Sequence, residues 1–180
     1  MVAYSYVKAR KEDVEKLFDP TFFPPGFVVN LAEVLNEKCR IYVNSREGVF
    51  SRERVEGFDE YVEILNNYVV GIAVNPVEAR TNLDIVVVYD DWGYLLPKGR
   101  EVMIVEARGK GVYPLVEEGS RVSKGSRLFY VVTGKYEVRV IRSPVDGVLF
   151  VISELIPSEI QVYRAVIARV EDLVELKRIR

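Results

Sequence analysis

Short apolar runs fill the second half of the chain. From residue 83 onward, runs such as LDIVVVY, RLFYVV and GVLFVI are rich in β-branched residues and are separated by Gly, Pro, Asp or Ser. Such spacing is typical of strands joined by tight turns, and no convincing helical pattern lies between them. The pattern predicts a small barrel or sandwich in this half.

The first part of the chain has a mixed pattern. Helical spacing of apolar residues predicts helices over 11–18, 31–38 and 58–68, with Asn30 as the N-cap of the second. Strands are expected over 39–43 and 69–74. We therefore expect a mainly β fold, α+β overall, in which a mixed α/β extension precedes the β half.

The interruption RGKG, residues 108–111, separates two predicted strands. It predicts an N-terminal α+β domain over residues 1–108 and a β domain over residues 109–180. The stretch LPKGRE, residues 96–101, is a second candidate hinge.

Composition places the chain among globular proteins, with 49% hydrophobic and 29% charged residues. Its apolar runs are shorter than the roughly 20 residues that a membrane-spanning helix needs, and the start lacks a signal-peptide pattern. Cys39 is the single cysteine, which excludes an internal disulfide and fits a reducing interior. We expect a soluble cytoplasmic protein.

The charges are nearly balanced, with 25 basic and 27 acidic residues and a net charge of −2. This balance gives no overall attraction to nucleic acid or to an anionic membrane. Gln161 is the single glutamine, while Glu, Arg, Lys and Tyr are plentiful, which resembles the composition of thermophilic proteins.

The absence of histidine excludes much of enzyme chemistry. Most catalytic zinc sites need histidine ligands, and nucleophiles activated by histidine are impossible within this chain. With no metal site and no catalytic motif, we expect a protein that is not an enzyme. Cys39 is expected to be a small buried apolar residue.

The stretch from Val116 to Gly147 carries an ordered set of turns. Glycines in 118–120 and 124–126 enclose a valine, a strand leads to a hairpin at Lys135, and residues 143–147 read Ser-Pro-Val-Asp-Gly. This order resembles the biotinyl/lipoyl-like domain, a barrel-sandwich hybrid, over about residues 112–170. The chain as a whole resembles an archaeal family of uncharacterised proteins with a domain of unknown function.

The resemblance implies that Lys135 occupies the position at which biotin or lipoate is attached covalently. Gly134 and Tyr136 flank it, whereas lipoyl domains usually have aspartate before the lysine and biotinyl domains have methionine on both sides. These neighbours favour a scaffold without a cofactor, and a carrier modified at Lys135 is the alternative. The interval from Lys135 to Ser143 is one residue longer than expected, which predicts a longer hairpin or a bulge.

Two further features are candidates for binding. Asp90 and Asp91 follow a strand and precede an aromatic residue, so they could bind a ligand or a cation, with Glu117 and Glu118 as additional oxygen donors. The aromatic loop at residues 22–27 is expected to pack between the two parts of the chain, and an exposed partner site is the alternative.

Three classes of function follow. The first is a non-catalytic binding or scaffold protein with a protein partner, the second is a biotin or lipoate carrier in an acyl- or carboxyl-transfer system, and the third is an enzyme that uses carboxylates, Lys or Tyr. The absent histidine makes the enzyme the least supported class, and we favour the first. No nucleic acid or membrane partner is expected, and self-association stays open.

Overall fold

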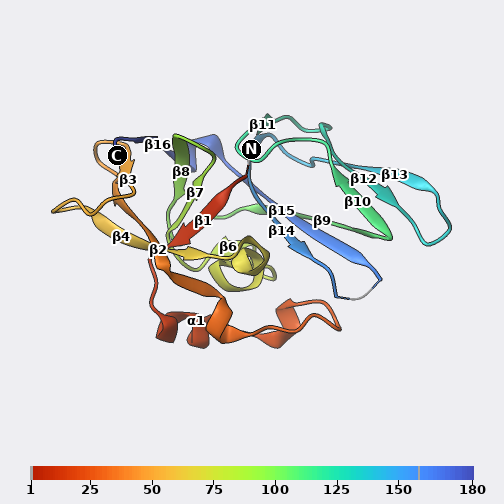
Figure 1. Ribbon diagram of the computed structural model, residues 1–180. Helices are drawn as coiled ribbons and strands as arrows, with labels where there is room; N and C mark the ends of the chain where they lie inside the picture. The colour runs from red at the N-terminus through yellow and green to blue at the C-terminus, as the bar shows by residue number, and fades with distance from the viewer. Residues whose placement is uncertain (1, 158) are drawn as a thin grey trace.

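The computed structural model describes residues 2–157 and 159–180. Strands dominate it, which confirms the prediction of a mainly β fold, and α1 (Lys11–Leu17) is the α-helix of the described residues. Figure 1 shows two β units side by side, a barrel in the left half of the view and a pair of sheets in the right half.

The barrel unit is a closed barrel of seven strands in the order β1-β4-β2-β3-β16-β8-β7. All neighbours are antiparallel except β16 and β3, which are parallel. The strands are β1 (Tyr4–Val7), β2 (Leu35–Asn44), β3 (Val49–Ser51), β4 (Asp59–Ile64), β7 (Ile85–Val88), β8 (Trp92–Leu96) and β16 (Val174–Arg178).

Alternation along the barrel strands builds two cores. In β7, Val86 and Val88 point into the barrel with Phe50, while Ile85 and Val87 point outward into a second cluster. A strand buried on both faces explains the continuous apolar run in this part of the sequence.

The sandwich unit consists of two antiparallel sheets. One has the order β11-β14-β15-β9 and the other the order β10-β12-β13. The strands are β9 (Met103–Gly109), β10 (Gly111–Pro114), β11 (Arg121–Val122), β12 (Arg127–Val132), β13 (Val138–Arg142), β14 (Gly147–Leu155) and β15 (Gln161–Ala168). Phe129, Leu149 and Ile167 pack between the two sheets.

The four-stranded sheet is buried on its other face as well. Phe150, Val151 and Val166 lie in the same cluster as Ile85 and Val87 of the barrel. The molecule is therefore layered as barrel, four-stranded sheet and three-stranded sheet, with one apolar core in each space between them.

Short elements complete the chain. The 3-10 turns are η1 (Pro20–Phe22), η2 (Leu31–Glu33), η3 (Asn66–Tyr68) and η5 (Val170–Asp172), η4 (Val69–Ala73) is a turn of π-helix type, and β5 (Val74–Asn75) pairs with β6 (Arg80–Thr81). None of the helices described within 2–157 and 159–180 is long and apolar enough to cross a membrane.

Two of the three predicted helices were wrong. Residues 31–38 form only the turn η2 before β2 starts, and residues 58–68 contain β4 followed by η3. Tyr61 points into the barrel and Ile64 into the outer core, so a strand buried on both faces imitates helical spacing. The first prediction is confirmed by α1, whose Val14 is buried.

The strand predicted over 69–74 was also wrong for most of its length. Residues 69–73 form η4, and Gly71 has a φ of 120°, which few other residues adopt. A Cβ atom at Gly71 would lie 2.7 Å from the Phe23 ring. Glycine lets the backbone turn tightly against this aromatic ring.

Strand pairing does not follow the expected limits of the two domains at two places. β9 precedes residue 109 yet pairs with β15 over its whole length. At the other end, β16 pairs with β8 and β3 and thus completes the barrel. By pairing, the sandwich unit spans residues 103–168, and the chain returns to the barrel after it.

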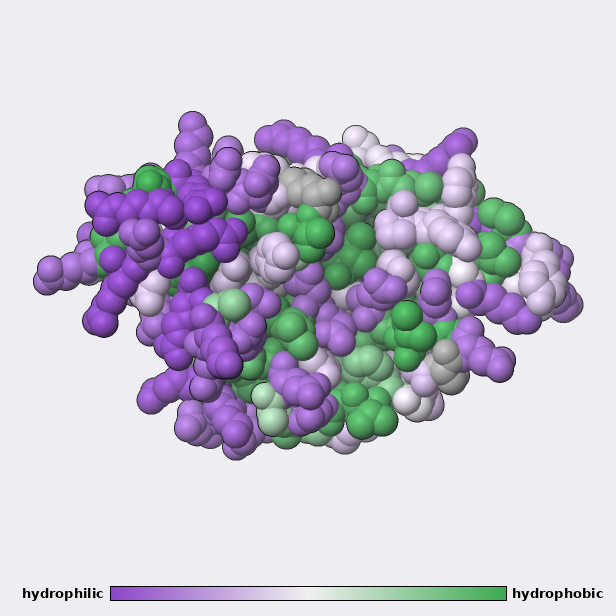
Figure 2. Space-filling model, in the orientation of Figure 1, coloured by the Kyte–Doolittle hydropathy of each residue, from purple (hydrophilic) through white to green (hydrophobic). Residues whose placement is uncertain are grey.

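The two units differ on the surface. Figure 2 shows mostly hydrophilic residues over the barrel at the left, and more apolar residues toward the sandwich and along the lower edge. At this lower edge the loop after α1 approaches the end of β14, since a Cβ atom at Gly26 would lie 3.3 Å from the Pro157 carbonyl oxygen.

Candidate functional site

The hairpin between β12 and β13 carries Lys135 at its tip. The Thr133 amide donates to the Glu137 carbonyl oxygen (2.8 Å), and the Tyr136 amide donates to the Thr133 carbonyl oxygen (2.9 Å), which closes a loop of residues 134–136. The residue with positive φ is Tyr136 (60°) and not Gly134. The tight turn therefore uses a tyrosine where glycine or asparagine is usual.

Lys135 is exposed, and no ion pair holds it in the described part of the chain. Its neighbour Tyr136 packs against Lys110, whose Nζ lies 4.6 Å from the ring centroid. A register shift occurs between Arg127 and Phe129, so the extra residue lies on β12 and not in the interval from Lys135 to Ser143, where a bulge was expected. The structure thus places Lys135 on a projecting hairpin.

The two glycine turns are built alike. The Gly119 amide donates to the Leu149 carbonyl oxygen (2.7 Å), and the Gly125 amide donates to the Ser143 carbonyl oxygen (2.8 Å). In return, the amides of Leu149 and Ser143 donate to the carbonyl oxygens of the serines that follow the glycines. The φ angles of 89° and 91° confirm the predicted role of these glycines.

Asp90 and Asp91 lie at the rim of the barrel. Asp91 pairs with Arg178 of β16, with 3.4 Å between Oδ1 and Nη1. Glu118 belongs to another place, since its carboxylate accepts a hydrogen bond from the Ile152 amide of β14. No group of three or more acidic or cysteine side chains gathers at metal-binding spacing in the described ranges. The structure does not bring the two acidic pairs into one cation site.

The same end of the barrel contains a polar group that the sequence did not reveal. Tyr6 of β1 is the direct partner of Glu63 in β4, and burial raises the pKa of the Tyr6 hydroxyl while the Arg52 side chain after β3 lowers it. Arg52, Asp90 and other residues line a hollow of about 310 Å³. Acidic and basic side chains both line this hollow, so its charge is mixed.

Cys39 lies in the bulge of β2, between Asn36 and Arg40. It is half-buried and not fully buried as expected, and the side-chain amide nitrogen of Asn36 donates a hydrogen bond to its sulfur (3.3 Å). Burial and the Glu63 carboxylate raise the pKa of the Cys39 thiol, which keeps it in the unreactive protonated form.

The aromatic loop packs between the units, as expected. Phe23 is buried, and its ring centroid lies 5.7 Å from that of Phe27 and 6.2 Å from that of Tyr68. Arg164 of β15 donates a hydrogen bond to the Phe22 carbonyl oxygen. The loop therefore ties the start of the chain to the sandwich unit.

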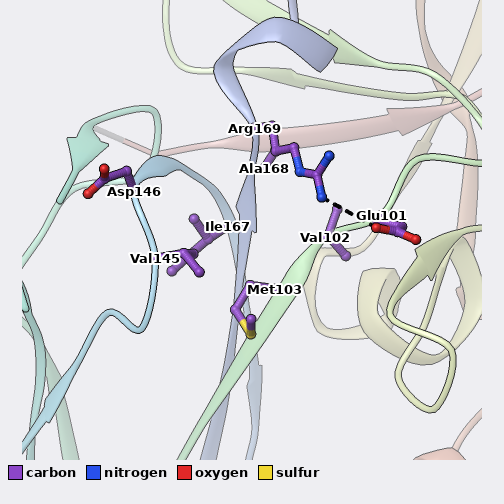
Figure 3. A pocket seen from close by; sticks show the side chains of 8 residues that line it. All are labelled: Glu101, Val102, Met103, Val145, Asp146, Ile167, Ala168 and Arg169. Atoms are coloured by element: carbon purple, nitrogen blue, oxygen red, sulfur yellow. Dashed lines mark hydrogen bonds and ion pairs between the residues drawn. The ribbon is translucent and has the colours of Figure 1, made fainter. Parts of the chain in front are cut away.

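A small hollow of about 200 Å³ lies where the chain crosses between the units (Figure 3). Val102, Met103, Val145 and Ile167 supply its apolar lining. Glu101 pairs with Arg169 at 3.4 Å, and Figure 3 shows this pair at one side of the hollow. The Asp146 carboxylate also has a partner, because it accepts a hydrogen bond from the Lys124 backbone amide. The charged groups that line this hollow therefore stabilise the fold.

A larger groove, of about 640 Å³, lies where η3 meets β14. Its charged lining consists of Glu118 and Glu154, and Tyr163 and Asn67 supply further polar groups. Burial raises the pKa of the Glu118 carboxyl, while the bond from the Ile152 amide lowers it. Sequence reasoning singled out Glu118 but not this groove, because η3 and β14 are far apart in the chain.

The outer face of the three-stranded sheet is apolar and exposed. Pairing places Tyr113, Tyr130 and Val140 in one row, and Val132 beside Val138 in the next. Tyr113 is 57% exposed and Val138 is 66% exposed. We call these five residues the outer-face patch. Apolar residues gathered in this way usually mark an interface.

Comparisons with known proteins place the chain in a family. Residues 6–170 match the family described as "Uncharacterized protein conserved in archaea (DUF2118)". The chain is 30% identical over 60 residues to the uncharacterized protein MJ0859 of Methanocaldococcus jannaschii, a match that covers 33% of this chain and 37% of the relative. Thus the matched stretch spans little more than a third of that relative. Since the family match includes most of both units, the chain belongs to the DUF2118 family of archaeal proteins.

Proposed function

We propose that this protein is a non-catalytic binding protein that uses its sandwich unit as an adaptor without a cofactor. The observation that carries the proposal is the outer-face patch, an exposed apolar surface on the outermost layer of the molecule. Its partner is a protein, because aromatic and aliphatic side chains on a flat sheet suit a polypeptide surface.

The sandwich unit is, in this proposal, a biotinyl/lipoyl-like barrel-sandwich hybrid. The matched hydrogen bonds of the turns at Gly119 and Gly125 support it, because both turns that carry the resemblance are built in the same way. The turn at residues 143–147 supports it as well, since the Ser143 hydroxyl donates to the Val145 carbonyl oxygen (2.6 Å). A Cβ atom at Gly147 would lie 2.5 Å from the Ala168 carbonyl oxygen, so the return of the chain needs glycine.

The edge of this sheet defines the partner more closely. Among the described strands β13 pairs with β12 alone, so its other edge offers free backbone groups to an added strand. Arg139 and Arg142 are exposed on β13, and Arg127 faces Arg142 on β12. We propose an extended, acidic segment of a partner protein as the occupant, because its carboxylates would neutralise Arg127 and Arg142, whereas Arg139 already pairs with Glu137 (3.6 Å).

Affinity capture from native extract tests this function. The wild-type protein should retain a discrete partner, and Val138→Glu should lose it, because the new carboxylate interrupts the patch and repels an acidic segment. Val77→Glu is the matched control, since Val77 is 79% exposed in the turn between β5 and β6, outside the sandwich unit. Equal retention by all three proteins would contradict the proposal.

A carrier function is the second candidate. The exposed position of Lys135 at the hairpin tip favours it, because a covalently attached arm must reach other active sites. Intact mass spectrometry distinguishes the two functions. The adaptor function predicts an unshifted mass after co-expression with a biotin or lipoate ligase and in protein from the native host. An adduct that disappears in Lys135→Arg would establish the carrier instead.

A further inference from the structure

The groove between η3 and β14, of about 640 Å³, lies at the junction of the two units, and junctions of this kind are common binding sites. It follows the edge of β14 that faces away from β15. There the Ile152 amide donates to the Glu118 carboxylate (2.8 Å), and the Ser153 hydroxyl donates to the Asn66 carbonyl oxygen (2.7 Å). The groove therefore has a fixed floor.

The walls of the groove are apolar. Ile152 lies on β14 and Ile156 directly follows this strand, Phe27 comes from the aromatic loop, and Leu65 precedes η3. Ile156 is 55% exposed and Leu65 is 36% exposed, so these side chains are open to a ligand. Such walls suit an aliphatic stem.

The charge in the groove has one sign. Glu118 and Glu154 line it, and no lysine or arginine does so in the part of the chain that the structure describes. The nearby Arg164 is directed elsewhere, since it pairs with Glu106 (3.5 Å) and with the Phe22 carbonyl oxygen. A ligand that completes this site brings a positive charge.

Glu118 is held but not saturated. Oε2 accepts the Ile152 amide, and Oε1 keeps its capacity for another donor. Tyr163 of β15 is the direct strand partner of Glu154, and its hydroxyl group lies beside this second carboxylate. Burial, followed by the Glu154 carboxylate, raises the pKa of Tyr163 to about 12, so this hydroxyl stays protonated and neutral.

From these contacts we propose that the groove binds a primary ammonium group on an aliphatic stem, with Glu118 and Glu154 as its anionic partners. The three N–H donors of an ammonium group suit two carboxylates and a hydroxyl, and the stem lies against the isoleucines. The source is either a free alkyl diamine or a lysine side chain of a polypeptide, which share this chemistry. The site is separate from the outer-face patch and does not depend on the proposed function.

Titration followed by NMR or calorimetry tests the proposal with three probes. These are 1,5-diaminopentane, a lysine blocked at both backbone ends, and 1-pentanol as the uncharged control. The first two probes carry the ammonium and the third does not, so we expect saturable binding of at least one amine and none of pentanol. Binding of diaminopentane alone assigns a free amine, and binding of blocked lysine assigns a polypeptide side chain.

Variants locate the site. Glu118→Gln keeps an acceptor for the Ile152 amide, and it should weaken amine binding by about tenfold, the effect of one charge-assisted hydrogen bond. Glu154→Gln should weaken it similarly. Glu117→Gln is the matched control because Glu117 is exposed and does not line the groove.

Three results would overturn the proposal: no binding of either amine, equal binding of pentanol, or the same affinity in Glu117→Gln, Glu118→Gln and Glu154→Gln. Val138→Glu, which should abolish partner capture, should leave amine binding unchanged. The failure of one proposal is thus distinguishable from the failure of the other.

Discussion

The Tyr89 hydroxyl donates a buried hydrogen bond to the Phe150 carbonyl oxygen at 2.7 Å, and this bond joins the barrel to the four-stranded sheet. Phe150 lies at a register shift of β14, between Leu149 and Val151. A strand partner is missing at such a bulge, so the tyrosine satisfies a carbonyl group that the ladder leaves free.

Tyr89→Phe should lower the free energy of unfolding by about 1–3 kcal/mol, because the Phe150 carbonyl would be buried without a partner. Urea unfolding measures the change. Tyr113→Phe serves as the control, since Tyr113 is exposed and its hydroxyl is open to solvent. Equal stability of Tyr89→Phe and the wild type would show that this bond contributes nothing.

The two glycine turns offer a matched pair. Gly119→Ala and Gly125→Ala each force a side chain into left-handed backbone, which costs about 1–2 kcal/mol. At Gly119 the new Cβ also lies 3.0 Å from the Tyr89 ring, whereas nothing lies within 4 Å at Gly125. The midpoint temperature of thermal unfolding should therefore be lower for Gly119→Ala than for Gly125→Ala. The reverse order would refute the packing of Gly119 on Tyr89.

The hairpin tip is strained at Tyr136, a non-glycine residue with a φ of 60°. Tyr136→Val should lower the free energy of unfolding by about 1–2 kcal/mol, because a β-branched side chain tolerates this backbone poorly. Tyr136→Gly should change it by less than about 1 kcal/mol, since relief of strain offsets the lost entropy and the lost Lys110 contact. Hydrogen exchange of the Glu137 amide reports on the tip directly.

Glu118 should make stability depend on pH. Burial raises the pKa of its carboxyl above the ordinary 4.5, so the folded protein holds this proton more tightly than the unfolded chain does. The contribution of Glu118 to the free energy of unfolding is fully present below pH 4.5. It is lost as the pH rises through the pKa that the carboxyl has in the folded protein. Glu118→Gln should thus exceed the wild type in stability at neutral pH, and urea unfolding should show this gain shrink below pH 4.5. A gain independent of pH would contradict this origin.

Local signals explain what the sequence predicted well. The strands of the second half, the glycine turns and the hairpin at Lys135 each depend on neighbouring residues, and the structure contains all three. Helical spacing failed over 58–68 because Tyr61 and Ile64 are buried on opposite faces of one strand. No local pattern could show this, since the second face is covered by residues far along the chain.

The groove and the outer-face patch also depend on contacts between residues that are far apart in the chain. The groove joins Leu65 and Asn67 to Glu154 and Tyr163, and the outer-face patch appears only when β10, β12 and β13 are paired. Asp90 and Asp91 stood out by their position between a strand and an aromatic residue, yet Asp91 pairs with Arg178 from the last strand. Composition indicates which groups are available, and the topology determines which of them meet.

Site-specific photo-crosslinking in native extract tests the adaptor function most directly. A photoreactive residue is placed at Val140, in the outer-face patch, and at Val77 as a control in the turn between β5 and β6. The account predicts one discrete covalent partner from position 140, none from position 77, and loss of the product when Val138→Glu is added. Products of equal yield from both positions, or none from position 140, would contradict the proposed role of the three-stranded sheet.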